Sequence, residues 1–362
     1  MSHGLDLNAG LKELVDFSTR AANTVNRLAQ MREEDIQIAK TPREKVDSIA
    51  GRTLYRIALD APRRVEVPVL ITYAMVGHWS ILDLQEDRSF LRKLREAGCD
   101  VYVIDWGHPT LADQFDDFSD LVDVYMGGFI ETICDRHGVS SVNLLGMCQG
   151  GVLSLCYAAL HRERTRNLIT LATPVDFHVD REQERTDTGF VNVWTRGLAA
   201  EDIDLLVDAM GNIPGEMGGT VFSLMSPFRT LTKYNMTLVQ AAQDPDALMN
   251  FLRMEKWLSD RPAHPGTAAR QWLKELYQDN KLVRGELAID GRQVDLKMLD
   301  MPIVNIYSDT DTIVHPLSCK ALRAVVSSKD YTEMEAPGGH VGMLVSRSKQ
   351  LPKAVADWLR SH

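Results

Sequence analysis

The stretch Val142-Asn143-Leu144-Leu145-Gly146-Met147-Cys148-Gln149-Gly150-Gly151-Val152, which continues to Leu160, decides the fold of this chain. Its apolar start predicts a short buried strand, and its apolar end predicts a helix from Val152 to Leu160. The glycines between them predict a sharp turn with Cys148 at its tip. This is the G-x-S-x-G nucleophile elbow, extended by one glycine and with cysteine in the serine position. A buried structural cysteine in a glycine-rich turn would look the same, so the assignment needs partners elsewhere in the chain.

Short apolar strands alternate with amphipathic helices on both sides of this elbow. Helices are predicted over residues 86–97 and 119–137 and in a closing segment that contains Trp358. Strands are predicted at residues 54–59 (an edge strand), 69–73, 101–104, 168–171, 302–307 and 331–335. Alternation of this kind is typical of parallel β/α winding. The predicted fold class is therefore α/β, an α/β-hydrolase fold with a mostly parallel sheet and an inserted helical cap.

The cap is predicted where the alternation stops, between residues 176 and 299. This segment opens with a charged stretch, His178–Thr188, for which we expect a mobile loop, and continues through helical pieces rich in Met, Trp, Phe and Tyr. Such side chains are more typical of the cap's own core than of a ligand site. An apolar lid over an elbow would keep water out. The expected organisation is an N-terminal helical segment and connector (1–50), a first core part (51–175), the cap (176–299) and a second core part (300–362).

The first 50 residues predict a helix followed by a connector. Apolar side chains recur at helical spacing, at Leu11, Leu14, Val15, Ala22, Val25 and Leu28. We expect this helix to lie on the domain; the alternative is a docking helix for a partner. Residues 31–50 are highly charged and predict a solvated connector.

Amino-acid composition limits the class of protein and the cellular compartment that can be expected. Hydrophobic residues make up 44% and charged residues 25%, which is ordinary for a globular protein, and a net charge of −10 argues against a nucleic-acid partner. No apolar run approaches the roughly 20 residues of a transmembrane helix, and the N-terminus lacks the pattern of a signal peptide. Five cysteines without a C-x-x-C pair predict a reducing compartment, with no disulfide framework and no metal site. We expect a cytoplasmic protein.

The candidate catalytic residues follow in the order Cys148, Asp311, His340. This is the nucleophile–acid–histidine order of α/β-hydrolases, with the acid after one late strand and the histidine after the next. Asp309 is the rival acid, but we expect it to serve as a turn or capping residue. His315 precedes a proline and is expected to pack in a loop, whereas His340 follows a Gly-Gly turn that gives its ring freedom to reach the nucleophile.

Two backbone N–H groups are candidates for an oxyanion hole. One belongs to Gln149, at the start of the helix that follows the nucleophile. The other belongs to Val76, in the loop Ala74-Met75-Val76-Gly77-His78 after a core strand, by position alone. His78 and His108 also follow core strands and could line the rim of the site, but we expect both to be exposed loop histidines.

Six blocks of the sequence belong together as a set: Gly146-Met147-Cys148-Gln149-Gly150-Gly151, Val101-Tyr102-Val103-Ile104-Asp105-Trp106-Gly107, Thr173-Pro174-Val175-Asp176-Phe177, Met210-Gly211-Asn212-Ile213-Pro214-Gly215-Glu216, Asn250-Phe251-Leu252-Arg253-Met254-Glu255-Lys256-Trp257 and Pro337-Gly338-Gly339-His340. Together they resemble the polyhydroxyalkanoate synthases, and the short length resembles the catalytic subunit of the class III enzymes (PhaC type). The sequence departs from that family at Gly77-His78-Trp79, where relatives carry Asn-Arg-Pro.

This resemblance implies an acyltransferase that polymerises (R)-3-hydroxyacyl-CoA, above all (R)-3-hydroxybutyryl-CoA, with release of CoA. It maps the nucleophile onto Cys148, the base onto His340 and the acid onto Asp311. Asp311 would orient His340 or help to deprotonate the incoming 3-hydroxyl, and we expect the second effect to dominate. No cofactor is implied, since CoA is part of the substrate. The implied partners are a second synthase subunit (PhaE type), further copies of the chain and the surface of a polyester granule.

Sulfur suits such chemistry for a reason independent of the family. A cysteine that attacks a CoA thioester exchanges one thioester for another, so the acyl group stays activated for transfer to a hydroxyl. The elbow alone would equally fit a cysteine-nucleophile hydrolase, such as a thioesterase, a dienelactone-type hydrolase or a polyester depolymerase. Besides a transferase and a hydrolase, the third possibility is an α/β-hydrolase scaffold that binds a partner without catalysing a reaction.

Overall fold

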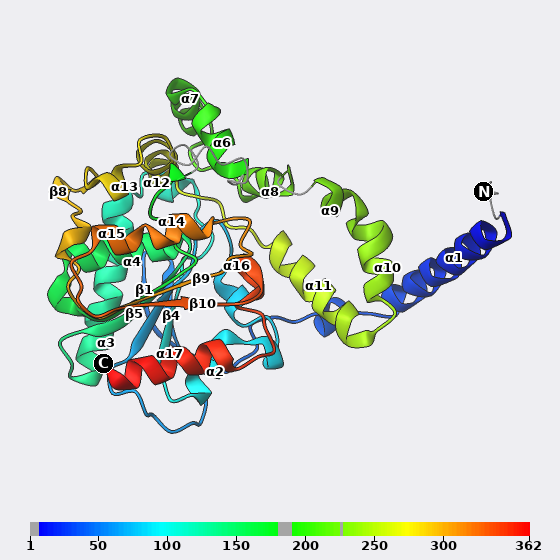
Figure 1. The fold of residues 1–362 in the computed structure, drawn as a ribbon, viewed down its shortest axis with the longest axis horizontal. Coiled ribbons are helices and arrows are strands. Elements are labelled where there is room, and N and C mark those ends of the chain that lie inside the picture. The colour runs from blue at the N-terminus through cyan, green and yellow to red at the C-terminus, as the bar shows by residue number, and fades with distance from the viewer. Residues whose placement is uncertain (1–6, 180–189, 225–226) are drawn as a thin grey trace, which may run out of the picture.

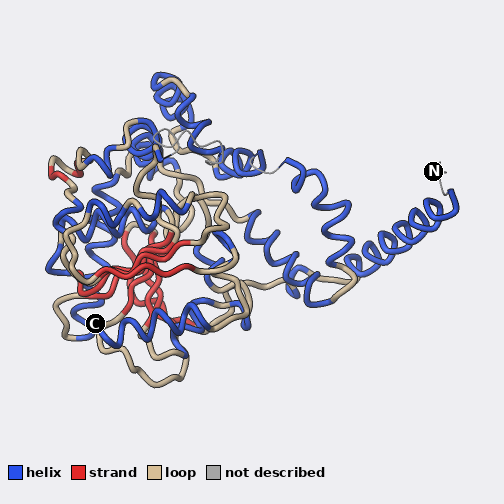
Figure 2. The backbone as a smooth tube through the Cα atoms, in the orientation of Figure 1, coloured by secondary structure: helices blue, strands red, loops and turns tan. Residues whose placement is uncertain are grey.

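A computed structural model describes residues 7–179, 190–224 and 227–362, and its centre is an eight-stranded sheet (Figures 1 and 2). The strand order is β1-β2-β4-β3-β5-β6-β9-β10, in which β1, β2 and β4 pair antiparallel and all pairs from β4 to β10 are parallel. The strands are β1 Arg43–Ile49, β2 Arg52–Ile57, β3 Val69–Thr72, β4 Val101–Asp105, β5 Val142–Met147, β6 Thr165–Leu171, β9 Ile303–Tyr307 and β10 Tyr331–Glu335.

Helices cover both faces of this sheet because successive strand residues point to opposite sides. In β5, Leu144 packs toward the layer of α3 (Gly128–His137) and α4 (Gln149–Leu160). Its neighbour Leu145 packs toward the layer of α2 (Phe90–Glu96) and α17 (Gln350–Ser361). The core helices are α2 Phe90–Glu96, α3 Gly128–His137, α4 Gln149–Leu160, α14 Pro316–Lys320, α15 Leu322–Val325, α16 Gly339–Gly342 and α17 Gln350–Ser361. A π-helical stretch, Asp120–Gly127, leads into α3. The predicted fold class, a mostly parallel sheet between helices, is confirmed.

The prediction of a solvated connector over residues 31–50 is wrong for Arg43–Ile49, which forms the edge strand β1. Consequently β2 is the second strand of the sheet. The sequence-based prediction of an edge strand at this position is wrong. The two strands form a hairpin whose loop residues Ala50 and Gly51 have φ of 44° and 83°. Positive φ at both loop positions matches the twist of a two-residue hairpin. Of the charged side chains in β1, Arg43 and Lys45 are exposed, as is usual on an edge strand, whereas Glu44 and Asp47 accept hydrogen bonds from Arg136 and Thr132.

The segment between β6 and β9 is mainly helical. Its elements are α6 Phe190–Gly197, α7 Ala200–Met210, α8 Gly215–Leu224, α9 Pro227–Thr232, α10 Leu238–Ala241, α11 Pro245–Ser259, α12 Gly266–Gln271, α13 Lys281–Arg284 and the small hairpin of β7 Ala288–Ile289 and β8 Arg292–Gln293. Residues 272–278 form a π-helical turn after α12. The loop predicted at 178–188 lies outside the described residues from 180 onward.

The N-terminal helix α1 (Leu7–Ala29) forms as predicted but does not lie on the domain. It projects away from the core and contacts the cap beside α10, where the Arg27 side chain donates a hydrogen bond to the Ala242 carbonyl (Figure 1). Its apolar side chains face outward: Leu11, Leu14, Val15 and Val25 are each at least 60% exposed. The expected packing on the domain is therefore wrong. Within the described ranges, no helix is both long and apolar enough to cross a membrane.

Candidate active site

The elbow holds Cys148 in a conformation that few residues adopt. The residue follows β5 directly, with φ of 51° and ψ of −122°, and its N–H donates to the Leu171 carbonyl 2.9 Å away. Such a conformation costs on the order of 1–3 kcal/mol and persists only where neighbours enforce it. A Cβ at Gly150 would overlap the carbonyl oxygen of Thr72, so only glycine lets α4 approach β3 this closely.

The sheet brings the other two candidates to the same edge. Because β5, β6, β9 and β10 are neighbours and parallel, the loops that follow them lie together. Asp311 is in the loop after β9, and His340 lies in α16 after β10. His340 Nδ1 is 2.7 Å from Asp311 Oδ2, which leaves Nε2 as the ring nitrogen available to Cys148, and Cys148 lies close enough to raise the pKa of His340. The structure thus brings all three sequence-predicted residues into one chain of contacts.

The loops that carry Asp311 and His340 are tied to each other. Asp311 Oδ1 accepts hydrogen bonds from the backbone N–H groups of Ile313 and Val314, at 2.8 and 3.0 Å. The hydroxyl of Ser308 accepts one from the N–H of Gly339, just before the histidine. The Asp311 side chain is 1% exposed and that of His340 is 8% exposed. The carboxylate is therefore rigidly placed, and both of its oxygens are already engaged.

Electrostatics favour a charged imidazole in this arrangement. Burial by itself would lower the pKa of His340, but the charge of Cys148, hydrogen bonds to Asp311 and to Cys148, and the charge of Asp311 together raise it to about 10. A histidine with such a pKa is the expected partner of a thiolate. Both neighbours, Cys148 and Asp311, thus favour the protonated form of His340.

Cys148 also differs from the other cysteines, all of which lie in the described residues. It is partly exposed, whereas Cys99, Cys134, Cys156 and Cys319 are buried. Burial raises the pKa of all four buried thiols, to about 12 for Cys99 and Cys156. A buried thiol in apolar surroundings is inert, so Cys148 is the thiol suited to nucleophilic chemistry.

The rival residues have other tasks. Asp309 is exposed at the surface, where its carboxylate is 3.5 Å from the ammonium of Lys320. His315 caps the start of α14, with its Nδ1 accepting from the N–H of Leu317. Asp309 lies in a turn, as the sequence predicted, whereas His315 caps a helix instead of packing in a loop. Neither side chain forms the Asp–His contact described above.

The prediction for the two loop histidines is half right. His108 is 58% exposed and bonds to Asp260 at 2.7 Å, as expected of a loop histidine. His78, by contrast, is only 15% exposed, between Asp105 of the core and Asp260 of the cap. Its carbonyl accepts a hydrogen bond from the indole N–H of Trp257. His78 is thus part of the contact between cap and core rather than an exposed side chain.

The two oxyanion candidates are linked by a contact that the sequence did not reveal. The side-chain oxygen of Gln149 accepts hydrogen bonds from the N–H of Met75 at 2.8 Å and, more weakly, from that of Val76 at 3.3 Å. The side-chain nitrogen of the same residue lies 2.7 Å from His264 Nε2. The carboxamide of Gln149 therefore connects the elbow, the loop after β3 and the cap.

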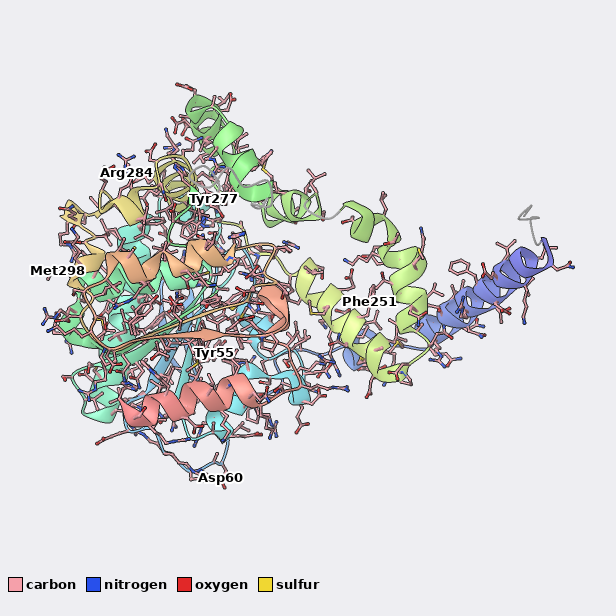
Figure 3. The ribbon with its side chains drawn as sticks, viewed as in Figure 1. Tyr55, Asp60, Phe251, Tyr277, Arg284 and Met298 are labelled. Carbon is pink, nitrogen blue, oxygen red and sulfur yellow. The ribbon has the colours of Figure 1, made fainter. Side chains whose placement is uncertain are left out.

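The surroundings of Cys148 are largely apolar. Val76 of the loop after β3 and Met254 and Trp257 of the cap pack, with Cys148, against one hydrophobic layer of the core. Tyr277, labelled in Figure 3, lies close enough for the charge of Cys148 to raise its pKa further, beyond the effect of burial.

Comparisons with known proteins identify the family. The model of the alpha/beta hydrolase fold family matches residues 67–346. The poly(3-hydroxyalkanoate) polymerase subunit PhaC of Allochromatium vinosum is 39% identical over 352 residues, which cover 96% of this chain and 96% of that protein. The chain belongs to the PhaC family. The corresponding subunit of a Synechocystis species is 40% identical over 98% of this chain and 93% of that protein.

Membership of the PhaC family confirms the resemblance noted in the sequence and the expectation of an acyltransferase. Among solved structures, a soluble variant of monoglyceride lipase from Saccharomyces cerevisiae matches with a TM-score of 0.53 and 14% identity, covering 89% of this chain and 95% of that one. That likeness extends to the fold alone. This chain therefore shares its scaffold with a hydrolase, and the scaffold alone does not decide the activity.

Proposed function

We propose that this protein polymerises (R)-3-hydroxyacyl-CoA, specifically (R)-3-hydroxybutyryl-CoA, into polyhydroxyalkanoate with release of CoA. The observation that carries the proposal is the hydrogen-bonded His340–Asp311 pair beside Cys148 on the elbow of a PhaC family member. Cys148 serves as nucleophile, His340 as general base and acid, and Asp311 as the group that orients the imidazole.

In the acylation step, the thiolate of Cys148 attacks the thioester carbonyl of the substrate. The negative charge that develops on the carbonyl oxygen is held by the backbone N–H groups of Gln149 and Val76. When the tetrahedral intermediate collapses, the bond to the CoA sulfur breaks and His340 gives its proton to that sulfur. The products are an acyl-cysteine thioester, free CoA and a neutral imidazole.

In the elongation step, His340 must accept a proton again. Acylation removes the charge of Cys148, which is the largest influence that raises the pKa of His340. The imidazole is then a neutral base that can take the proton from the 3-hydroxyl of the acceptor. That oxygen attacks the acyl-cysteine carbonyl, an ester bond forms, and Cys148 leaves as the thiolate beside a protonated His340. The same residue thus serves both steps because its pKa follows the charge on sulfur.

Asp311 acts through His340 in this mechanism. The sequence-based expectation was that it acts chiefly on the acceptor hydroxyl, but its contacts support the orienting role. Its Oδ2 accepts from the imidazole, and its Oδ1 accepts from two backbone N–H groups. A carboxylate with both oxygens engaged and 1% exposure is poorly placed to receive a proton from substrate.

Asp311→Asn is therefore expected to slow acylation and elongation together, by about 10²- to 10⁴-fold. An asparagine can present an N–H to Nδ1 and so stabilise the wrong tautomer of His340. The measurement is the burst of CoA released in one turnover against the steady rate that follows. Asp309→Asn is the matched control, because that carboxylate is exposed, and its activity should stay near wild type. A normal burst followed by a blocked steady phase in Asp311→Asn would instead assign the residue to the hydroxyl.

The product distinguishes a polymerase from a hydrolase. We expect the purified protein, supplied with (R)-3-hydroxybutyryl-CoA and its cognate second subunit, to release CoA and to form a polyester. Recovery of free 3-hydroxybutyrate, one molecule for each CoA released, would instead support the thioesterase alternative. Release of no CoA under either condition, with Cys148 unreactive toward alkylation, would support a non-catalytic scaffold.

The proposal includes partners and a place in the cell. We propose a complex with a second synthase subunit of the PhaE type and with further copies of this chain, in the cytoplasm at the surface of the polyester granule. The outward apolar side of α1, which carries Leu11, Leu14 and Val15, supports the alternative interpretation of this helix as a docking element. Such an unpartnered apolar face is typical of an interaction surface.

A further inference from the structure

The carboxamide of Gln149 has contacts that the catalytic steps above do not use. The side chain is buried, with the residue 2% exposed, and extends from the first turn of α4 to the loop after β3. Its oxygen takes the stronger hydrogen bond from the N–H of Met75 and a longer one from Val76. The N–H of Val76 is thus held near the elbow by this longer bond, which it must give up in order to donate to an oxyanion. The backbone N–H of Gln149 is the other oxyanion donor, so one residue links both halves of the hole.

His264 fixes which way the Gln149 carboxamide points. The imidazole is buried, with Nδ1 3.2 Å from the Pro265 carbonyl and Nε2 2.7 Å from the Gln149 side-chain nitrogen. A carbonyl can only accept, so Nδ1 carries the proton and Nε2 accepts from the amide nitrogen. Burial lowers the pKa of His264 to about 4, so the ring is neutral at ordinary pH. The amide oxygen must therefore point toward Met75.

His264 itself is anchored in the cap. Its backbone N–H and carbonyl pair with those of Ile213, at 2.8 and 2.9 Å. The neighbouring Asn212 accepts from the N–H of Gly266 and donates to the carbonyl of Thr110 in the core, at 2.6 Å. The position of the imidazole thus depends on how this part of the cap is held against the core.

We propose that Gln149 and His264 are a positioning pair that aligns the Val76 N–H with Cys148 and makes the oxyanion hole depend on correct docking of the cap. The inference rests on the proposed acyl transfer, because only a carbonyl reaction develops an oxyanion. Oxyanion donors must sit about 2.7–3.1 Å from the oxygen, and a misplacement of about 1 Å can reduce the rate 100-fold. Neither side chain touches the reacting atoms, so both act through the loop after β3.

The test compares two reactions of the same sulfur. Acylation by (R)-3-hydroxybutyryl-CoA needs the oxyanion hole, whereas alkylation by iodoacetamide is a displacement at saturated carbon and needs only the thiolate. In Gln149→Leu and in His264→Leu, we expect the first-turnover release of CoA to fall about 10- to 100-fold, as for the loss or misplacement of an oxyanion donor. The rate of Cys148 alkylation should stay within about twofold of wild type, because neither substitution touches the Cys148–His340 pair.

Two variants separate positioning from a general effect on the fold. His264→Gln keeps an acceptor near the place of Nε2 and should restore much of the acylation that His264→Leu loses. Arg253→Gln removes a different contact between cap and core, since Arg253 bonds to the Gln37 carbonyl and the Gln85 side chain, and should leave acylation near wild type. The double variant Gln149→Leu/His264→Leu should be no slower than either single one if the residues act as a unit.

The outcomes distinguish this inference from the proposed function. If the wild-type protein releases no CoA from the substrate, the proposed function fails. If the wild-type protein turns over and the two leucine variants acylate as fast as it does, the positioning role fails while the function stands. A parallel loss of acylation and alkylation would show that the elbow itself is disturbed, and this too would overturn the inference. Slow acylation with normal alkylation, rescued by His264→Gln, supports it.

Discussion

Replacing Cys148 by alanine is expected to reduce CoA release from (R)-3-hydroxybutyryl-CoA to the uncatalysed background. The substitution removes the only partly exposed thiol and leaves the rest of the site intact. Stability should change little, because the side chain is small and not fully buried. The pKa of His340 should fall markedly from about 10, since the charge of Cys148 is the largest influence that raises it. Turnover, the melting temperature and an NMR titration of the imidazole measure these three effects.

Cys148→Ser is the companion variant. A serine hydroxyl is far less acidic than a thiol, so His340 cannot hold it ionised, and an oxyester would be a poorer acyl donor. We expect most activity to be lost here as well, although a slow burst remains measurable. If Cys148→Ala turned over substrate at an appreciable fraction of the wild-type rate, another residue would be the nucleophile.

His340→Gln should be as damaging as the loss of the nucleophile in the first acylation. Without the imidazole, nothing draws the proton from Cys148 and nothing protonates the departing CoA sulfur. Alkylation of Cys148 by iodoacetamide near pH 7 should slow together with acylation, because both need the thiolate. This shared loss is the opposite of the pattern expected for His264→Leu. The measurement is the alkylation rate and the burst of CoA, followed side by side.

His315→Gln is the control for this experiment. His315 caps α14 through its Nδ1, so its replacement removes one capping contact and should cost about 1 kcal/mol of stability at most. Acylation should remain close to wild type. A larger loss of acylation in His315→Gln than in His340→Gln would overturn the assignment of the base.

The elbow and its partners could be predicted because their signals are local. The glycines around Cys148 lie between an apolar strand and an apolar helix and predict a tight turn, and the order of Cys148, Asp311 and His340 matches the order of the triad in α/β-hydrolases. The same reasoning separated Asp309 and His315 from the site, since a turn aspartate and a histidine before proline have short-range explanations. Such predictions hold in the folded protein because they depend on residues that are close together in the chain.

What could not be predicted depends on contacts between distant segments. The strand β1 was hidden because its charges look like a solvated linker, and only the small loop at Ala50 and Gly51 marks the hairpin. The side chain of Gln149 and its partner His264 are 115 residues apart, so nothing local connects them. The sequence offered one signal for His264, namely its place in a stretch with Pro and Gly that interrupts a helical segment. The outward position of α1 likewise depends on tertiary contacts that periodicity does not report.

The strand order has a consequence for a growing chain on the ribosome. N-terminal parts of a protein generally fold first, so β5 can pair with β3 and β6 before β9 and β10 exist. At that stage the elbow is formed, but Cys148 has neither the imidazole nor the carboxylate beside it. The late formation of β10, which places His340, is thus expected to leave unfinished chains without the group that can take a proton from this sulfur.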